Sequence, residues 1–213
     1  MHLTVLVWGL TAILGKLISL TALTLVLYRM GFATVLLAGW AMVRGISLRV
    51  PRGDALRLLL TGALVAAHWV CFYACIKVAG ISVAVVCLSS GGLITALLNP
   101  LILKTPIRVS EVVFGVFAVV GVVLLVNEVP ALTPAGLALG LASSLFSAVF
   151  GSINGRLTHR FDATVLSTWE LATGGTLVLL LTLARGEAIP MPWQVAGSDW
   201  LWLTVLTVVC TVI

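Results

Sequence analysis

Long apolar runs divide this chain into segments of the length that a bilayer-spanning helix requires, which is about 20 residues. Short polar breaks separate eight such segments, at 3–19, 22–43, 57–78, 82–103, 109–127, 134–155, 164–184 and 199–213. In lipid, only helices and closed barrels satisfy all of their backbone hydrogen bonds. We therefore predict an all-α fold, a polytopic membrane helical bundle whose outer surface contacts the lipid bilayer.

The composition excludes a water-soluble globule. Hydrophobic residues make up 61% of the chain and charged residues 9%, whereas a soluble domain carries roughly 25% charge. The eight segments leave no room for a catalytic domain outside the membrane. The 12 Lys and Arg residues are scattered between apolar runs and form no basic stripe, so a nucleic-acid partner is not expected.

Nothing in the sequence resembles an enzyme site. It contains no H-E-x-x-H, G-x-S-x-G, Walker or dinucleotide-binding motif. The four cysteines lie inside apolar runs without a C-x-x-C spacing or nearby histidines, so we expect neither a metal site nor a cofactor. The only conceivable catalytic pair is Ser89 or Ser90 with His68. Without an ATP-binding motif, any active transport must use an ion or solute gradient.

The distribution of positive charge predicts the orientation. Connections after the second, fourth and sixth segments hold eight Lys and Arg residues, and those on the opposite side hold three. Cytoplasmic loops of membrane proteins are enriched in these residues. We therefore predict a multi-pass protein of the cell inner membrane with a cytoplasmic N-terminus.

An internal repeat emerges when the chain is compared with itself at a shift of about 140 residues, the kind of self-similarity that marks repeat architectures. Four pairs of positions come into register: Gly15-Lys16-Leu17 with Gly155-Arg156-Leu157, Tyr28-Arg29 with Trp169-Glu170, Arg44-Gly45 with Arg185-Gly186, and Asp54 with Asp199. A repeat unit of five spans inverts the second unit relative to the first, as in many secondary transporters. Because the last segment is short and ends on an apolar run, we expect the second repeat to be incomplete here and the natural protein to continue past Ile213.

Several motifs resemble the EamA-like branch of the drug/metabolite transporter superfamily. They are Trp8-Gly9 with Gly15-Lys16, Tyr28-Arg29, His68-Trp69 through Ile76-Lys77, and Asn99-Pro100-Leu101-Ile102. The resemblance implies a ten-helix inner-membrane protein of two five-helix repeats, often exporting amino acids, metabolites or drugs from bacteria. It divides the chain into a first repeat at 1–127 and a second, truncated repeat at 134–213.

The sequence departs from the family pattern near the fourth segment. Many relatives carry an acidic residue before the proline and an acidic turn after it, where this chain has Asn99 and Lys104-Thr105. A coupling role for an acid at these positions therefore does not transfer.

Arg29 and Glu170 are the main candidates for function. An ionisable group at the centre of a span costs about 2.5–3.5 kcal/mol on insertion scales, so it needs a partner or water. We hypothesise that both line a central pathway, with Arg29 holding a solute carboxylate and Glu170 accepting an ammonium group or a proton. The alternative is a structural ion pair that fixes how the repeats dock.

Further residues are candidates for the solute pathway. His68 is either a proton relay, given its ordinary pKa of about 6.5, or a hydrogen-bonded packing residue. Lys16 lies near the end of its span and is expected to extend its ammonium to the interface if it does not serve the pathway. Aromatic residues supply a pocket wall or pack against lipid, namely Trp8, Tyr28, Trp69 and Tyr73. Ser90 and Asn99 fall where Ser89-Ser90-Gly91-Gly92 and Asn99-Pro100 predict a distorted helix.

The sixth segment carries small residues at every fourth position, in the row Gly136, Gly140, Ser144 and Ala148. Such rows let helices approach closely in lipid. Packing within the chain is the favoured interpretation, and a homodimer is the alternative. Taken together, these features predict a secondary transporter that exports a small organic metabolite, amino acid or drug by alternating access. The alternative is a non-transporting structural or assembly subunit.

Overall fold

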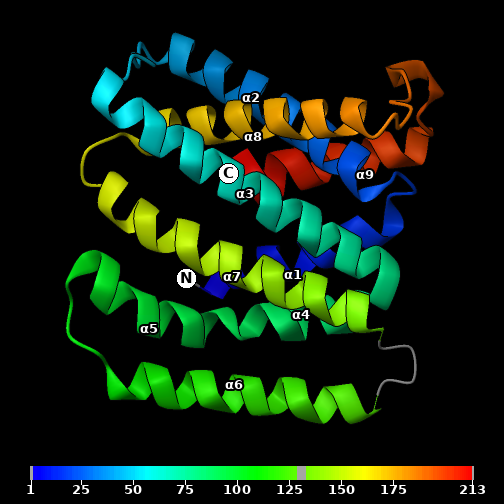
Figure 1. Ribbon diagram of the computed structural model, residues 1–213. Coiled ribbons are helices and arrows are strands. Elements are labelled where there is room, and N and C mark those ends of the chain that lie inside the picture. Colours follow the sequence, from blue (N-terminus) through cyan, green and yellow to red (C-terminus); the bar gives the residue numbers. More distant parts are fainter. Residues whose placement is uncertain (1, 129–132, 213) are drawn as a thin grey trace. The chain divides into compact units, whose positions relative to one another are not determined.

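The computed structural model describes the backbone of residues 2–128 and 133–212, and the side chains of this part except at 2–8, 122, 125–128 and 212. The helices are α1 (His2–Leu17), α2 (Ala22–Val43), α3 (Arg52–Ala79), α4 (Ile81–Ser89), α5 (Gly91–Leu103), α6 (Val109–Glu128), α7 (Pro134–Leu157), α8 (Ala163–Ala184) and α9 (Gly197–Thr207). A short 3₁₀ turn (Pro192–Gln194) precedes α9, and a π-helical segment, η2 (Val208–Val212), follows it. Figure 1 shows their arrangement.

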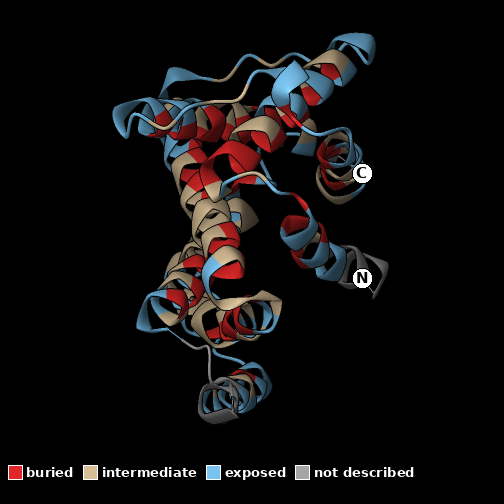
Figure 2. Cartoon of the chain, turned by 90° about the vertical axis from the view of Figure 1, so that its right-hand side faces the viewer, coloured by how far each residue is buried: buried red, intermediate tan, exposed pale blue. Residues whose placement is uncertain are grey.

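The predicted all-helical membrane bundle is confirmed. Within the described residues, five helical segments are long and apolar enough to cross a bilayer: Ala22–Val43, Arg52–Ala79, Ile81–Leu103, Pro134–Leu157 and Ala163–Ala184. Many large apolar side chains face outward, including Val35 on α2 and Phe114 on α6, which are 70% and 72% exposed. Figure 2 shows exposed and buried residues sharing the same helices, as expected for helices that meet lipid on one side.

Local sequence explains the helix ends. Thr21 caps α2, since its Oγ1 accepts a hydrogen bond from Thr24 N at 3.3 Å. At the C-terminus of α2, Gly45 adopts a φ of 66°, which a glycine tolerates without strain. Its N–H donates to Met42 O, and the following N–H of Ile46 donates to Ala41 O at 2.8 Å.

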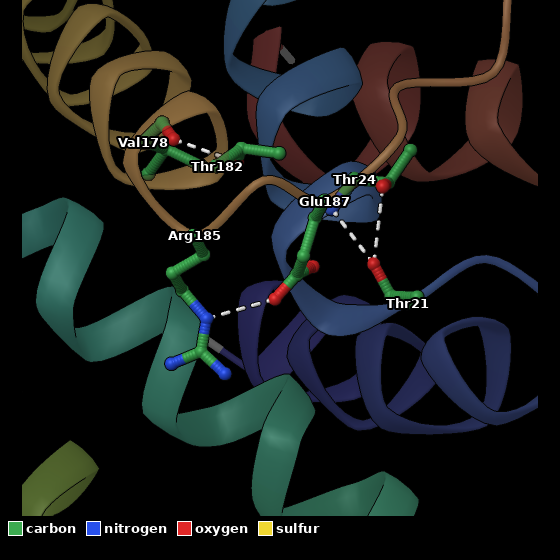
Figure 3. A network of polar contacts seen from close by, with 6 residues as sticks. All are labelled: Thr21, Thr24, Val178, Thr182, Arg185 and Glu187. Carbon is green, nitrogen blue, oxygen red and sulfur yellow. Dashed lines mark hydrogen bonds and ion pairs between the residues drawn. The ribbon is translucent and has the colours of Figure 1, made fainter.

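The C-terminus of α8 repeats this conformation. Gly186 has a φ of 64°, its N–H donates to Leu183 O, and the N–H of Glu187 donates to Thr182 O at 3.1 Å. Figure 3 shows this turn, where Arg185 Nε lies 2.9 Å from Glu187 Oε1, together with the Thr21 cap of α2. Arg44-Gly45 and Arg185-Gly186 therefore end their helices in the same way.

Two segments differ from the sequence-based boundaries. Helix α3 begins at Arg52 rather than at 57, because Pro51 precedes a polar first turn that lies outside the apolar run. The predicted distortion of the fourth segment is present as a break at Ser90, which separates α4 from α5.

The chain forms two compact units, and the boundary between them falls within α3. The first unit comprises residues 1–66 and 161–213. In it α2 packs along α8, and α9 contacts both α1 and α2. Close approach at one point depends on Gly62 of α3, where a Cβ atom would lie 2.8 Å from Glu170 O. Small residues permit this spacing in lipid, where dense packing replaces the hydrophobic effect.

The second unit comprises residues 67–160, in which α4 and α5 contact both α6 and α7. The row of small residues on α7 packs within this unit. A Cβ atom at Gly136 would clash with Ala79 Cβ, and one at Gly140 would lie 2.7 Å from Cys87 Cβ. Each unit contains helices from both expected repeats. The compact units therefore do not coincide with the sequence repeats expected at 1–127 and 134–213.

Candidate functional site

Arg29 lies in the interior of α2 and is only 4% exposed. Its Nε donates to Thr211 Oγ1 at 2.9 Å, and its Nη2 donates to the carbonyl of Cys210 at 3.3 Å. Thr211 Oγ1 in turn donates to Leu206 O at 3.2 Å. The guanidinium therefore holds the π-helical segment η2 through two hydrogen bonds, one to a side-chain hydroxyl and one to a backbone carbonyl. Single-turn π segments of this kind occur frequently at functional sites.

Glu170 lies on α8 in the same unit and is 6% exposed. Its backbone meets α3 at Gly62, and the neighbouring Trp169 donates from Nε1 to Leu48 O at 2.9 Å. These contacts hold the backbone of α8 in place at Trp169 and Glu170. The structure thus brings the helices of Arg29 and Glu170 side by side, since α2 packs along α8 (Figure 1).

An aromatic cluster joins α2 to the start of α9. Tyr28 and Phe32 are stacked at 5.8 Å between ring centroids, and Trp200 meets them edge-on at 5.5 and 5.3 Å. The hydroxyl of Tyr28 donates to the carbonyl of Pro190. Tyr28, one of the predicted pathway residues, is therefore anchored in a rigid ring cluster.

His68 lies on α3 in the second unit, where it meets Ser143 of α7. Its Nδ1 atom is 2.9 Å from both the Oγ and the carbonyl oxygen of Ser143. The imidazole also lies 6.1 Å from the ring of Phe72 and 5.7 Å from that of Phe150. This environment holds the ring in place and matches the packing interpretation, while the role as a proton relay stays a prediction.

Four other candidates lie in the second unit. Ser90 is buried at the helix break, where its Oγ donates to Cys87 O at 2.6 Å and lies 3.0 Å from Ser144 Oγ. Tyr73 is fully buried and Trp69 half-buried. Asn99 precedes Pro100 on α5, and its Oδ1 atom is buried without a hydrogen-bond partner among the described residues.

The two remaining candidates are on α1. Lys16 is exposed in the last turn of the helix, which fits an ammonium group at the membrane interface. Trp8 lies outside the residues whose side chains are described. In the part of the chain that is described, no group of three or more His, Cys, Asp and Glu side chains is placed to hold a metal ion.

Asp199 is a buried acidic residue to which the sequence assigned no site role. It lies in the first turn of α9 and is 2% exposed. Its carboxylate accepts hydrogen bonds from Ser19 N at 2.9 Å and from Ser19 Oγ at 2.5 Å. Asp54, its counterpart in the sequence repeat, is likewise buried in the first turn of α3. An aspartate beside an apolar run is the one signal available in the sequence, and it does not identify the partner.

Comparison with known proteins gives a family and a fold. The profile of the EamA-like transporter family matches residues 1–127, which confirms the resemblance. No curated protein matches the chain. A solved structure titled "Crystal structure of protein" is 19% identical, with a TM-score of 0.72 over 96% of this chain and 71% of that one. At this identity the likeness concerns the fold alone.

Proposed function

Because this chain belongs to the EamA-like transporter family, we propose that it is a secondary transporter that exports a small organic metabolite, amino acid or drug by alternating access. The family itself makes the chain a multi-pass membrane transporter of the drug/metabolite type. The solute, the direction and the mechanism belong to the proposal.

The burial of Arg29 within α2 is the observation that carries the proposal. A guanidinium keeps its charge in proteins and binds carboxylates through two parallel hydrogen bonds. Its contacts include a hydroxyl and a backbone carbonyl of η2, both of them neutral acceptors. A solute carboxylate competes for the same donors and forms stronger, charge-assisted bonds. Solute binding would thereby release Arg29 from η2 and couple occupancy to a movement of α9 against α2.

Glu170 supplies the complementary charge. It lies on the helix next to that of Arg29 and within the same unit. A carboxylate there accepts either the ammonium group of an amino-acid solute or a proton that drives the cycle. The close contact of Gly62 with the backbone of Glu170 fixes the position of α8 at this residue. A purely structural role for the two charges is the competing explanation, and it predicts normal transport when folding is preserved.

Two observations support the proposed repeat, and a third supports the proposed orientation. The equivalent glycines Gly45 and Gly186 have φ values of 66° and 64° at the ends of α2 and α8, and the equivalent Asp54 and Asp199 are both buried. The eight-to-three distribution of positive residues across alternate connections supports an inner-membrane protein with a cytoplasmic N-terminus.

Efflux from proteoliposomes tests the proposal. The full chain is reconstituted into vesicles loaded with a mixture of ¹⁴C-labelled amino acids, under an imposed proton gradient. We expect efflux above that of loaded vesicles without the protein. The efflux rate should fall at least roughly tenfold for Arg29→Gln and for Glu170→Gln, since each loses a charge-assisted contact. Arg185→Gln is the matched control, because that arginine is exposed and pairs with Glu187 outside the helices. Undiminished efflux in both variants would remove the two charges from the mechanism.

A further inference from the structure

The connection from α2 to α3 and the first turns of α3 carry four arginines, none of which the proposed transport cycle uses. They are Arg44, Arg49, Arg52 and Arg57. Arg57 lies 3.0 Å from the carboxylate of Asp54. The other three are exposed, and none of them forms an ion pair with a carboxylate of the described residues. Three positive charges beside the end of α2 are therefore left for an anion from outside the chain.

The corresponding turn at the end of α8 has the same backbone conformation, but its arginine is neutralised. There Arg185 Nε lies 2.9 Å from Glu187 Oε1. The residue that corresponds to Glu187 in the turn after α2 is Ile46. One acidic residue is thus enough to compensate the arginine of this turn, and the sequence leaves Arg44 without it.

Hydrogen bonds hold the connection after α2 in one conformation. The N–H of Ile46 donates to Ala41 O at 2.8 Å, which folds the chain back onto the last turn of the helix. Farther along, Trp169 Nε1 of α8 donates to Leu48 O at 2.9 Å, and Arg49 follows this anchored residue directly. A site whose backbone is already ordered loses less conformational entropy when it binds a ligand.

Trp40 places Arg44 at the level of lipid headgroups. The apolar span of α2 ends at Val43, and the guanidinium carbon of Arg44 lies over the Trp40 ring, 5.3 Å from its centroid. Trp40 is 51% exposed, as is typical of tryptophans at the membrane interface. Leu36 and Phe32 are exposed at intervals of four residues along the same face. This face therefore presents a cation at the interface and apolar side chains within the span, which matches the two parts of a phospholipid.

We propose that the connection from α2 to α3 binds an anionic phospholipid, in the simplest case a phosphatidylglycerol. Arg44 contacts the phosphate, Arg49 and Arg52 add attraction, and an acyl chain lies along the exposed face of α2. A guanidinium binds phosphate through two parallel hydrogen bonds, and arginine clusters next to a membrane span attract anionic lipids. The apolar face favours a lipid over a soluble phosphate, which gains nothing from it. The site is independent of the transport proposal, whose two charges lie inside the spans.

Native mass spectrometry of the full chain in detergent micelles tests the proposal by resolving the first bound lipid. The probes are phosphatidylglycerol and phosphatidylcholine with identical acyl chains, and glycerol 3-phosphate as a soluble phosphate. We expect the wild type to bind phosphatidylglycerol most tightly. Arg44→Gln should lower the ratio of phosphatidylglycerol to phosphatidylcholine affinity roughly 5-fold, the effect of one charge at a membrane surface. The melting temperature of the protein should stay close to that of the wild type, because the Arg44 side chain is exposed.

Arg108→Gln is the matched control. Arg108 is exposed, lies in a connection expected on the same side of the membrane, and already pairs with Glu111 at 3.2 Å. Its removal changes the net charge equally and should leave the affinity ratio unchanged. Trp40→Leu removes the ring over which Arg44 lies and should lower the ratio roughly 2- to 5-fold, as the loss of an exposed cation–π contact implies. Arg44→Lys keeps the charge and should retain a higher ratio than Arg44→Gln.

Three outcomes overturn the proposal. The first is an equal affinity ratio in the wild type and Arg44→Gln. The second is an equal fall in Arg44→Gln and Arg108→Gln, because net charge alone would then attract the lipid. The third is binding of glycerol 3-phosphate as tight as that of phosphatidylglycerol, which would assign the arginines to a soluble anion.

Discussion

The Nε atom of Arg29 lies 2.9 Å from Oγ1 of Thr211, which joins a buried charge on α2 to the π-helical segment that follows α9. The two residues are 182 positions apart in the sequence. This contact places the strongest hydrogen-bond donor of α2 at a segment whose backbone departs from α-helical geometry. The contact therefore ties the segment after α9 to a charged side chain in the interior of α2.

Thr211→Val should weaken the attachment of η2 to α2. The variant removes one of the acceptors of a charged donor, and hydrogen bonds to charged groups contribute about 1.5–3 kcal/mol. We expect the free energy of unfolding in detergent to fall by about that amount. Thr204→Val is the matched control, because its hydroxyl bonds only within α9. Equal stability of the wild type and Thr211→Val would show that the contact contributes little.

Gly62→Ala should destabilise the first unit. The added Cβ atom would lie 2.8 Å from both Glu170 O and Thr173 Cβ, and overpacking of this kind costs typically about 1–3 kcal/mol. Thermal unfolding in nanodiscs measures the effect. Gly39→Ala on α2 serves as the comparison, since no atom lies within 4 Å of its added Cβ and alanine favours the helix. A melting temperature for Gly62→Ala at or above that of Gly39→Ala would contradict the close packing of α3 on α8.

Asp199→Ala should loosen the start of α9 from the connection between α1 and α2. The carboxylate accepts two hydrogen bonds from Ser19 and is 2% exposed. Because Ser19 is exposed, water can replace the lost acceptor, so we expect the free energy of unfolding to fall by about 0.5–1.5 kcal/mol, the net contribution of an ordinary hydrogen bond. A double-mutant cycle with Ser19→Ala measures the side-chain part of this coupling. Additive losses of unfolding free energy in the two single variants would contradict it.

The apolar runs predict most of the fold because a bilayer imposes a length and a composition on each span. Helix α2 begins at Ala22 and ends at Val43, as the sequence predicts. The first turn of α3 was missed because Arg52 and Asp54 are polar and lie outside the membrane pattern. The π-helical geometry of η2 was also missed, since Val208–Val212 reads as an ordinary apolar helix.

The site was only partly predictable for a similar reason. Arg29 and Glu170 stand out because charges are rare within apolar spans. The residues around them cannot be recognised in the sequence. Thr211, Cys210 and Gly62 are common residue types, and they become neighbours of Arg29 or Glu170 only through tertiary packing.

Asp162 should make the start of α8 sensitive to pH. Hydrogen bonds from Thr164 hold the pKa of this N-cap carboxyl below its usual range. A pKa that is lower in the folded state gives stability that is complete above the unfolded value, about 3.9, and that is lost as the pH falls through the folded value. We expect wild type to melt above Asp162→Asn at pH 7, and the difference to vanish in strong acid. A difference that does not change with pH would contradict this assignment.

The aqueous accessibility of position 29 tests the central claim most directly. Arg29→Cys is introduced into a variant without the four native cysteines and is treated with a membrane-impermeant methanethiosulfonate reagent from each side of the bilayer. Glu187→Cys, in the connection between α8 and α9, reports that the reagent works. We predict that the thiol introduced at position 29 reacts from at least one side and that a transported solute slows the reaction. If that thiol stays unmodified from both sides while the one at position 187 reacts, Arg29 borders no aqueous pathway.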